Sequence, residues 1–220
     1  MTTRSRILRT VGFGAAVLAL SGCSVDFHPG SAADVNGTAI SQGQVNDITD
    51  AACSYTAELR KTDSRYPLVG LADLRSGIVT GMVQEEITQQ VADKQGLTVS
   101  DAQVNSIAVQ NVNSIPDAVP DDDREALTTF FDDQARSNIL QALIGKHAKD
   151  SSVTDGSEVT TDEIGATSKP WMKAYFEDAD VSVDPSFGHW NGTTLDPGTG
   201  SLSQPASTEK AELTDAEQCG

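Results

Sequence analysis

The stretch Val35-Asn36-Gly37-Thr38-Ala39-Ile40-Ser41-Gln42-Gly43-Gln44-Val45 decides the fold, because it joins a tight turn to the start of a helix. Asn-Gly between apolar residues is a strong signal for a two-residue turn, so a short strand pair is predicted over residues 34–40. Ser41 with Gln44 matches a capping box, in which the two side chains satisfy backbone N–H groups at a helix start. The helix that follows is predicted to end near Lys61. Its apolar face recurs at steps of three and four residues: Val45, Ile48, Ala52, Tyr55 and Leu59.

Apolar periodicity predicts three further helices, over residues 71–95, 100–115 and 121–149. Ser100 with Gln103 repeats the capping-box pattern at the start of the second of these. The third begins with three aspartates and closes with cationic side chains, and both ends suit the helix dipole. The first part of the chain is therefore predicted to be helical.

Beyond residue 149 the pattern changes to short elements. We expect a loop over residues 150–167, a short helix from Lys169 to Glu177 and a strand at Val181–Val183. This strand is expected to pair with the hairpin at 34–40, so that segments near both ends of the domain form a small β element. The remainder, residues 191–220, is expected to be a mostly disordered acidic tail unless Cys219 ties it to the rest of the domain.

The N-terminus has the features of a secretory signal. Arginines at positions 4, 6 and 9 precede an apolar stretch over residues 11–20, which is too short to span a bilayer. The segment ends Leu20-Ser21-Gly22-Cys23, which resembles the bacterial lipobox. We therefore predict a lipoprotein signal peptide over 1–22, lipidation of Cys23 and a tether over 23–33, with an ordinary signal peptide as the alternative. Attachment of at least two acyl chains would anchor the protein stably to the extracytoplasmic face of the cell membrane.

Lipidation of Cys23 would leave Cys53 and Cys219 as an even pair in an oxidising compartment. A disulfide between them would tie the tail to the first predicted helix, and two free thiols are the alternative. The sequence has no C-x-x-C motif, so neither a thioredoxin-type site nor a zinc ribbon is indicated.

Composition and motifs exclude several classes of function. The chain has 220 residues, 15 Lys plus Arg and 32 Asp plus Glu, for a formal net charge of −17. So acidic a surface repels phosphate backbones and argues against nucleic-acid binding. No hydrolase, P-loop, zincin or dinucleotide motif occurs, and Asp121–Asp123 are interpreted as a helix start rather than a cation site. We expect no catalytic residue, no metal and no cofactor.

Two segments together carry a family resemblance. The opening stretch is followed some 50 residues later by Gly96-Leu97-Thr98-Val99-Ser100-Asp101-Ala102-Gln103-Val104, and this order resembles the N-terminal chaperone module of SurA and its PrsA- and PpiD-type relatives. Residues 181–190 look like the return strand of related lipoproteins. The resemblance covers about 34–149 and 181–190. It implies a mainly α, SurA-N-like helical domain over 34–190 with a small β element.

The resemblance implies a membrane-anchored, extracytoplasmic chaperone that binds unfolded or secreted polypeptides. Relatives often carry a parvulin prolyl-isomerase domain after the helices, but only residues 150–180 are available here, and the three histidines lie far apart. Isomerase activity is therefore not implied, and we expect no enzyme. A non-chaperone adaptor subunit of a cell-envelope complex is the alternative. The candidate client-binding residues are aromatic, with core packing as their alternative role: Phe130, Phe131, Trp171 and Tyr175.

Overall fold

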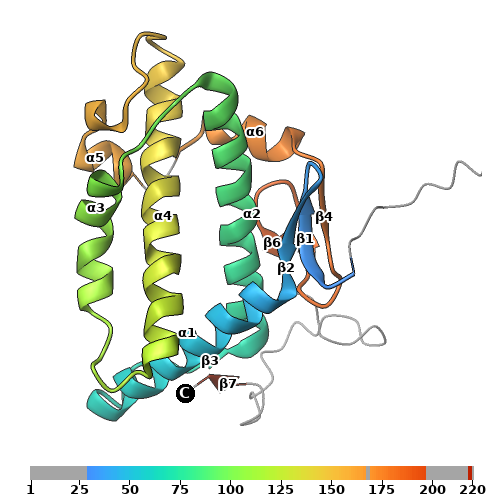
Figure 1. Cartoon of the computed structure of the whole chain (residues 1–220). Coiled ribbons are helices and arrows are strands. Elements are labelled where there is room, and N and C mark those ends of the chain that lie inside the picture. Colours follow the sequence, from blue (N-terminus) through green and yellow to red (C-terminus); the bar gives the residue numbers. More distant parts are fainter. Residues whose placement is uncertain (1–28, 167–168, 197–217, 220) are drawn as a thin grey trace, which may run out of the picture.

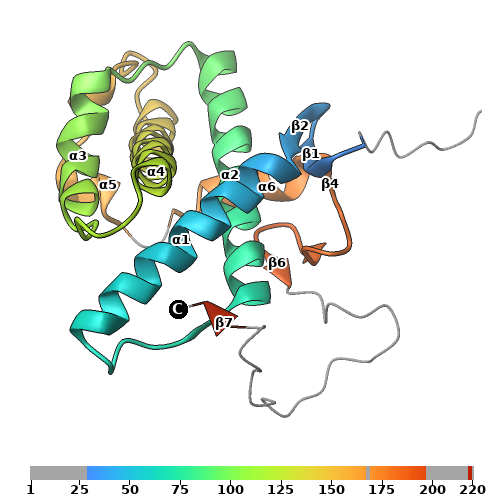
Figure 2. The same ribbon diagram turned by 60° about the horizontal axis from the view of Figure 1, so that its bottom comes forward.

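The structure, a computed structural model, describes residues 29–166, 169–196 and 218–219. Its body consists of four long helices: α1 (Gln42–Thr62), α2 (Leu71–Gln95), α3 (Asp101–Asn113) and α4 (Asp121–His147). Helices α2, α3 and α4 run alongside one another, and α1 crosses α2 and α4 obliquely near one end (Figures 1 and 2). No helix in the described part of the chain has both the length and the apolarity that a bilayer span requires.

Local side-chain chemistry fixes the helix starts that the sequence predicted. The Ser41 hydroxyl caps α1 by accepting hydrogen bonds from the N–H groups of Gly43 and Gln44, at 3.0 and 3.4 Å. At α3 the full capping box forms, because Ser100 accepts from the Gln103 N–H while the Gln103 side chain accepts from the Ser100 N–H. These bonds satisfy backbone donors that have no partner within the helix.

A three-stranded antiparallel sheet, with strand order β2-β1-β4, closes one side of the domain (Figure 1). It consists of β1 (Ser31–Val35), β2 (Thr38–Ser41) and β4 (Val181–Val183). Asn36 and Gly37 form the predicted turn with φ values of 52° and 90°. Val35 pairs with Val181, so the expected pairing between segments near the two ends of the domain is confirmed. The strand begins at Ser31, however, and the predicted tether is wrong at its last three residues, because Ala32 and Ala33 are buried and β1 packs against α2.

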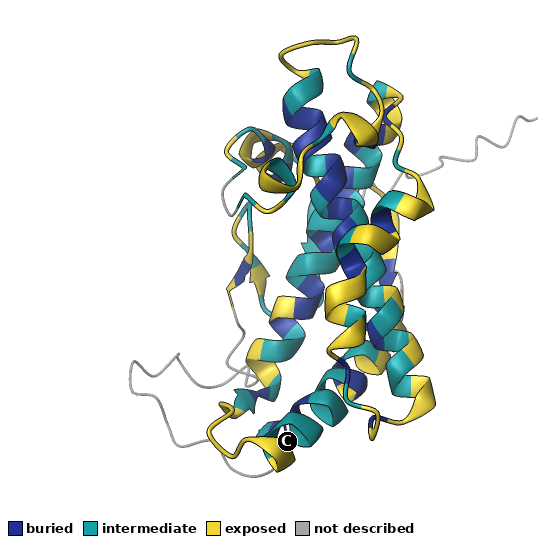
Figure 3. Cartoon of the chain, turned by 90° about the vertical axis from the view of Figure 1, so that its left-hand side faces the viewer, coloured by how far each residue is buried: buried dark blue, intermediate teal, exposed yellow. Residues whose placement is uncertain are grey.

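The main core lies between α2, α4 and this sheet. Buried residues follow the inward faces of the long helices, and exposed residues follow their outward faces (Figure 3). Ile87, Leu143 and Ile144 are almost fully buried at the centre. Phe187 and Leu195, from the C-terminal part of the chain, belong to the same core. The domain therefore includes residues well beyond the four long helices.

The C-terminal region contains more structure than the sequence predicted. The expected loop over 150–167 contains η1 (Gly156–Glu158) and α5 (Thr161–Ile164), which a Thr160–Glu163 capping box starts. The short helix is present as α6 (Met172–Asp178). In the expected disordered tail, β6 (Leu195–Asp196) pairs with β5 (His189–Trp190). The strand β7 (Gln218–Cys219) pairs with β3 (Val69–Gly70). The expectation of disorder is wrong at β6, whereas β7 contains Cys219, whose attachment was the stated exception. Residues 197–217 lie outside the described part.

Replacement of glycine by alanine is expected to change the free energy of unfolding in opposite directions at two helical positions. A Cβ on buried Gly145 would lie 2.5 Å from the Trp171 ring, whereas a Cβ on exposed Gly77 would meet nothing within 4 Å. We expect Gly145→Ala to lower the free energy of unfolding by about 1–3 kcal/mol through overpacking. Gly77→Ala should raise it by about 0.5–1 kcal/mol through helix propensity. Urea denaturation of the two variants checks both signs, and a stabilised Gly145→Ala would contradict the packing described here.

Candidate functional site

Three adjoining hollows open where α1 crosses α2 and α4. Their volumes are about 490, 460 and 210 Å³, and all three are lined by Ile48 of α1 and Phe130 of α4. Met82 of α2 lines two of them. We call this continuous surface the Phe130 groove.

The floor of the groove is an apolar surface that stays accessible, because α1 crosses its neighbours instead of lying along them. Ile48 and Tyr55 belong to the face that the sequence predicted as core, yet both are only half-buried. The fully buried positions of α1 are Val45, Thr49 and Ala51. The oblique crossing therefore leaves part of the apolar stripe accessible. The other apolar residues around the 460 Å³ hollow are Ala52, Val69, Leu74, Ile78, Leu127 and Phe131.

The two adjacent phenylalanines take different roles. Their ring centroids lie 6.0 Å apart, with the ring planes inclined at 51°. Phe131 packs against a small buried cluster that contains Ile115, Val119 and Leu127, whereas Phe130 borders all three hollows. This divergence follows from the angle of about 100° between successive helix positions. Phe130 is thus the candidate that the structure places at the centre of the groove.

The wall of the groove is acidic. Asp47 and Asp50 of α1 face the first turn of α4 across the 490 Å³ hollow. Among the described residues that line the three hollows there is no Lys, Arg or His. An apolar floor and a wall lined by carboxylates therefore share one site. The carboxylates lining the 490 Å³ hollow are Asp47, Asp50, Asp122, Asp123, Glu125 and Asp133.

Two carboxyl groups at the inner end of the groove have altered acidity. Burial raises the pKa of Glu85 to about 7, and repulsion from Asp133 and Glu86 adds to the rise while Arg136 opposes it. Burial also raises the pKa of Asp133, with Arg136 opposing the rise and Asp132 adding to it. Glu85 is therefore about half protonated at neutral pH, and deprotonation would place another negative charge beside the groove.

The Glu85 shift predicts a pH-dependent stability. The native state keeps this proton between pH 4.5 and about 7, where an unfolded chain has released it. The stabilising contribution of the bound proton is therefore complete below pH 4.5 and is lost as the pH rises from 4.5 through 7, by about 3 kcal/mol in total. Glu85→Gln should flatten this part of the curve of unfolding free energy against pH, while Glu125→Gln, at an exposed site, should leave it in place. Parallel curves for all three proteins would contradict the assignment.

The other two aromatic candidates do not lie in the groove. The Trp171 indole N–H donates to the Gln141 carbonyl at 2.7 Å, and the ring packs on the main core beside Gly145. The Tyr175 hydroxyl accepts from the Gln95 side chain at 3.3 Å, and its ring also packs on this core. The structure therefore does not bring Trp171 and Tyr175 together with Phe130, because tertiary contacts already occupy them.

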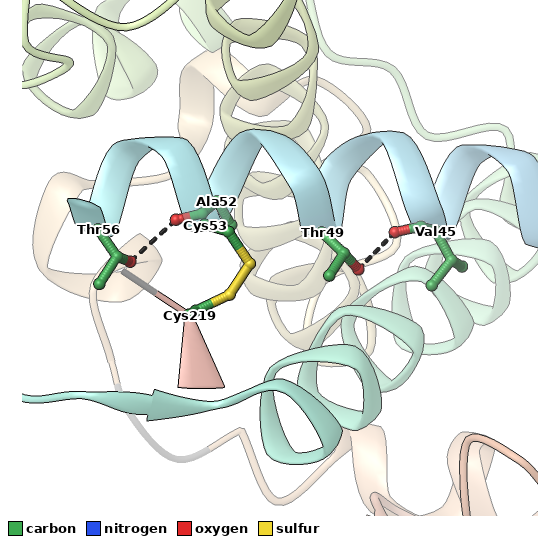
Figure 4. The surroundings of a disulfide bond; sticks show 6 residues. All are labelled: Val45, Thr49, Ala52, Cys53, Thr56 and Cys219. Atoms are coloured by element: carbon green, nitrogen blue, oxygen red, sulfur yellow. Dashed lines mark hydrogen bonds between the residues drawn. A yellow bond between two sulfur atoms is a disulfide. The ribbon is translucent and has the colours of Figure 1, made fainter. Parts of the chain in front are cut away.

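The disulfide borders the apolar end of the groove. Cys53 of α1 is bonded to Cys219 of β7, with the Cα atoms 4.8 Å apart, which is the pairing expected from parity (Figure 4). Cys219 pairs with Val69, which lines the 460 Å³ hollow. The C-terminal strand thus holds one wall of the groove in place.

The remaining sites considered in the sequence concern metal binding and lipidation. Within the ranges that the structure describes, no three or more His, Cys, Asp or Glu residues are grouped so as to hold a metal ion. Asp121–Asp123 form the first turn of α4. Cys23, the predicted lipidation site, and the predicted signal segment lie outside the described residues.

Comparison with known proteins gives one match. The family model described as the SurA-like N-terminal domain matches residues 3–135, from the predicted signal segment into α4, and this range includes Ile48, Met82 and Phe130. No curated protein and no solved structure matches the chain.

Proposed function

Since the chain belongs to the SurA-like N-terminal domain family, a chaperone-related module, we propose that it is a membrane-anchored extracytoplasmic chaperone. It would bind unfolded or secreted polypeptides without catalysis. The observation that carries this proposal is the Phe130 groove, an accessible apolar surface inside the family-matched region.

The groove has the dimensions and chemistry that side chains of an unfolded segment need. Its larger hollows fall within the usual size range of ligand sites. Half-buried Ile48, Met82 and Phe130 offer apolar area that a bound side chain would remove from water. The acidic wall keeps this surface soluble between binding events.

Anchoring rests on the sequence Leu20-Ser21-Gly22-Cys23 after a basic and apolar segment. A thioether-linked lipid on Cys23 would hold the helical domain at the extracytoplasmic face of the cell membrane. Metabolic labelling with a fatty-acid analogue should mark the natural chain and not Cys23→Ala. Equal labelling of the two would end this part of the proposal.

Aggregation suppression tests the chaperone activity directly. The chain from residue 24 onward should slow the aggregation of several unfolded proteins, and Phe130→Ala should weaken client binding about tenfold. Val109→Ala is the matched control, because Val109 is an apolar residue that is 45 % exposed on α3 and lies outside the groove. If the natural protein suppresses no aggregation, an adaptor subunit of an envelope complex becomes the better assignment. If both variants weaken binding equally, the groove is not the binding site.

A further inference from the structure

We propose that the Phe130 groove selects polypeptide segments in which Lys or Arg lies next to apolar residues. This inference rests on the proposed function and adds a substrate class to it. The occupant is an extended, cationic and apolar stretch of an unfolded client.

The first support is the arrangement of charge around the apolar floor. Carboxylates stand on both walls of the 490 Å³ hollow, on α1 through Asp47 and Asp50 and on α4 through Asp122 and Asp123. Ile48, Met82 and Phe130 line the same hollow. A segment that places an apolar side chain on this floor therefore places its neighbouring residues beside negative charge.

The second support is that Asp47, Asp50, Asp122 and Asp123 form no ion pair with any other described residue, whereas Asp133, at the inner end, interacts with Arg136. The ion pairs among the described residues involve Glu58, Asp63, Asp117, Asp101, Glu163 and Glu177. None of these residues lines the groove. The wall thus keeps its charge for a ligand, and the absence of basic lining residues leaves an acidic client without a counter-charge.

The shape of Lys and Arg side chains suits this combination. Their aliphatic stems lie along apolar surface while the charged ends reach a polar rim. In an extended segment, successive residues advance about 3.3 Å. A Lys or Arg one or two positions from an apolar residue on Phe130 can therefore reach the carboxylates of either wall. The charge contact would raise the association rate and the selectivity more than it raises the intrinsic affinity.

Binding of matched peptides to the chain from residue 24 onward tests the inference. Three fluorescent peptides share one Leu- and Phe-containing core and differ only in their flanking residues, which are Lys, Ser or Glu. Fluorescence anisotropy should give a Kd for the Lys-flanked peptide at least about tenfold below that of the Glu-flanked one, and the difference should shrink between about 50 and 300 mM salt. The Ser-flanked peptide should lie between them.

A matched pair of triple variants locates the effect. Asp47→Asn/Asp122→Asn/Asp123→Asn should bring the Lys- and Glu-flanked peptides to within about threefold while the Ser-flanked peptide still binds. Asp162→Asn/Asp178→Asn/Asp180→Asn removes the same charge from exposed positions outside the groove and should keep the preference.

Each failure has a separate meaning. Equal affinity of the natural protein for all three peptides would overturn the inference and leave the chaperone proposal standing. Loss of preference in both triple variants would assign the effect to overall charge and would also overturn the inference. Failure of every peptide to bind would count against the proposed function itself. Because the peptide series uses the chain from residue 24 onward without any substitution, the test does not depend on the folding of a substituted variant.

Discussion

Phe187→Ala is expected to lower the free energy of unfolding by about 3–4 kcal/mol, which is the usual range for emptying a buried phenylalanine site. Phe187 is 7 % exposed and belongs to the main core with Ile78 and Val79. Its carbonyl accepts a hydrogen bond from the Ser76 hydroxyl at 3.0 Å. The residue lies far beyond the family-matched range, so this loss would show that the C-terminal segment is an integral part of the domain.

Urea denaturation of Phe187→Ala and Phe130→Ala provides the comparison. Phe130 is only half-buried, so its truncation should cost less than about 1.5 kcal/mol. The two variants should therefore separate the effects, with Phe187→Ala losing stability and Phe130→Ala losing client binding. Equal losses of stability would mean that Phe187 is not a core residue.

Cys219→Ser is expected to lower the free energy of unfolding by about 2–4 kcal/mol. The disulfide joins positions separated by 166 residues, and the chain-entropy estimate for so long a loop is about 5 kcal/mol. Residual structure in the unfolded chain lowers this figure. Removal of the bridge also releases β7 from β3, so that the wall formed by Val69 loses its support.

Two comparisons isolate the bridge itself. Cys53→Ser/Cys219→Ser should be about as stable as Cys219→Ser, because both proteins lack the same bond. A reductant should destabilise the natural chain and leave the double variant unchanged. Thiol titration of the denatured, unreduced chain from residue 24 onward provides a chemical check, since two free thiols would contradict the disulfide.

The helices were predictable because their end signals are local. The predicted bounds of α2 agree with the structure, and Gly96 adopts the left-handed conformation at its C-terminus with φ of 67°. The hairpin was predictable for the same reason, since Asn36-Gly37 defines its turn within the chain. In each case a few neighbouring residues supply the geometry and the hydrogen bonds.

The missed elements depend on partners distant in the sequence. Ser31–Ala33 has no strand signal of its own and becomes part of β1 through β2, β4 and the core. Gln218–Cys219 becomes a strand by pairing with Val69–Gly70. Neither pairing can be recognised from local propensity.

The groove was only partly predictable. Phe130 was predicted as a binding residue because it is aromatic. Ile48 and Met82 also line the groove, but their spacing in the sequence is that of core residues. The crossing of α1 decides which part of its apolar face stays accessible, and this angle is set by tertiary packing rather than by periodicity. The same limit explains Trp171, whose ring is held by the Gln141 carbonyl.

The pairing of β1 with β4 also dictates an order of events during biosynthesis. A chain made from its N-terminus presents β1 long before residues 181–183 exist, and Cys53 long before Cys219. Helices α1 to α4 can begin to associate through nearer contacts, but the sheet lacks its outer strand and the thiol stays reduced until the last part of the chain arrives. Complete folding is thereby postponed until the whole chain is available, and the closing step is formation of the Cys53–Cys219 bond, in which both thiols lose their protons and an external two-electron oxidant takes up the electrons.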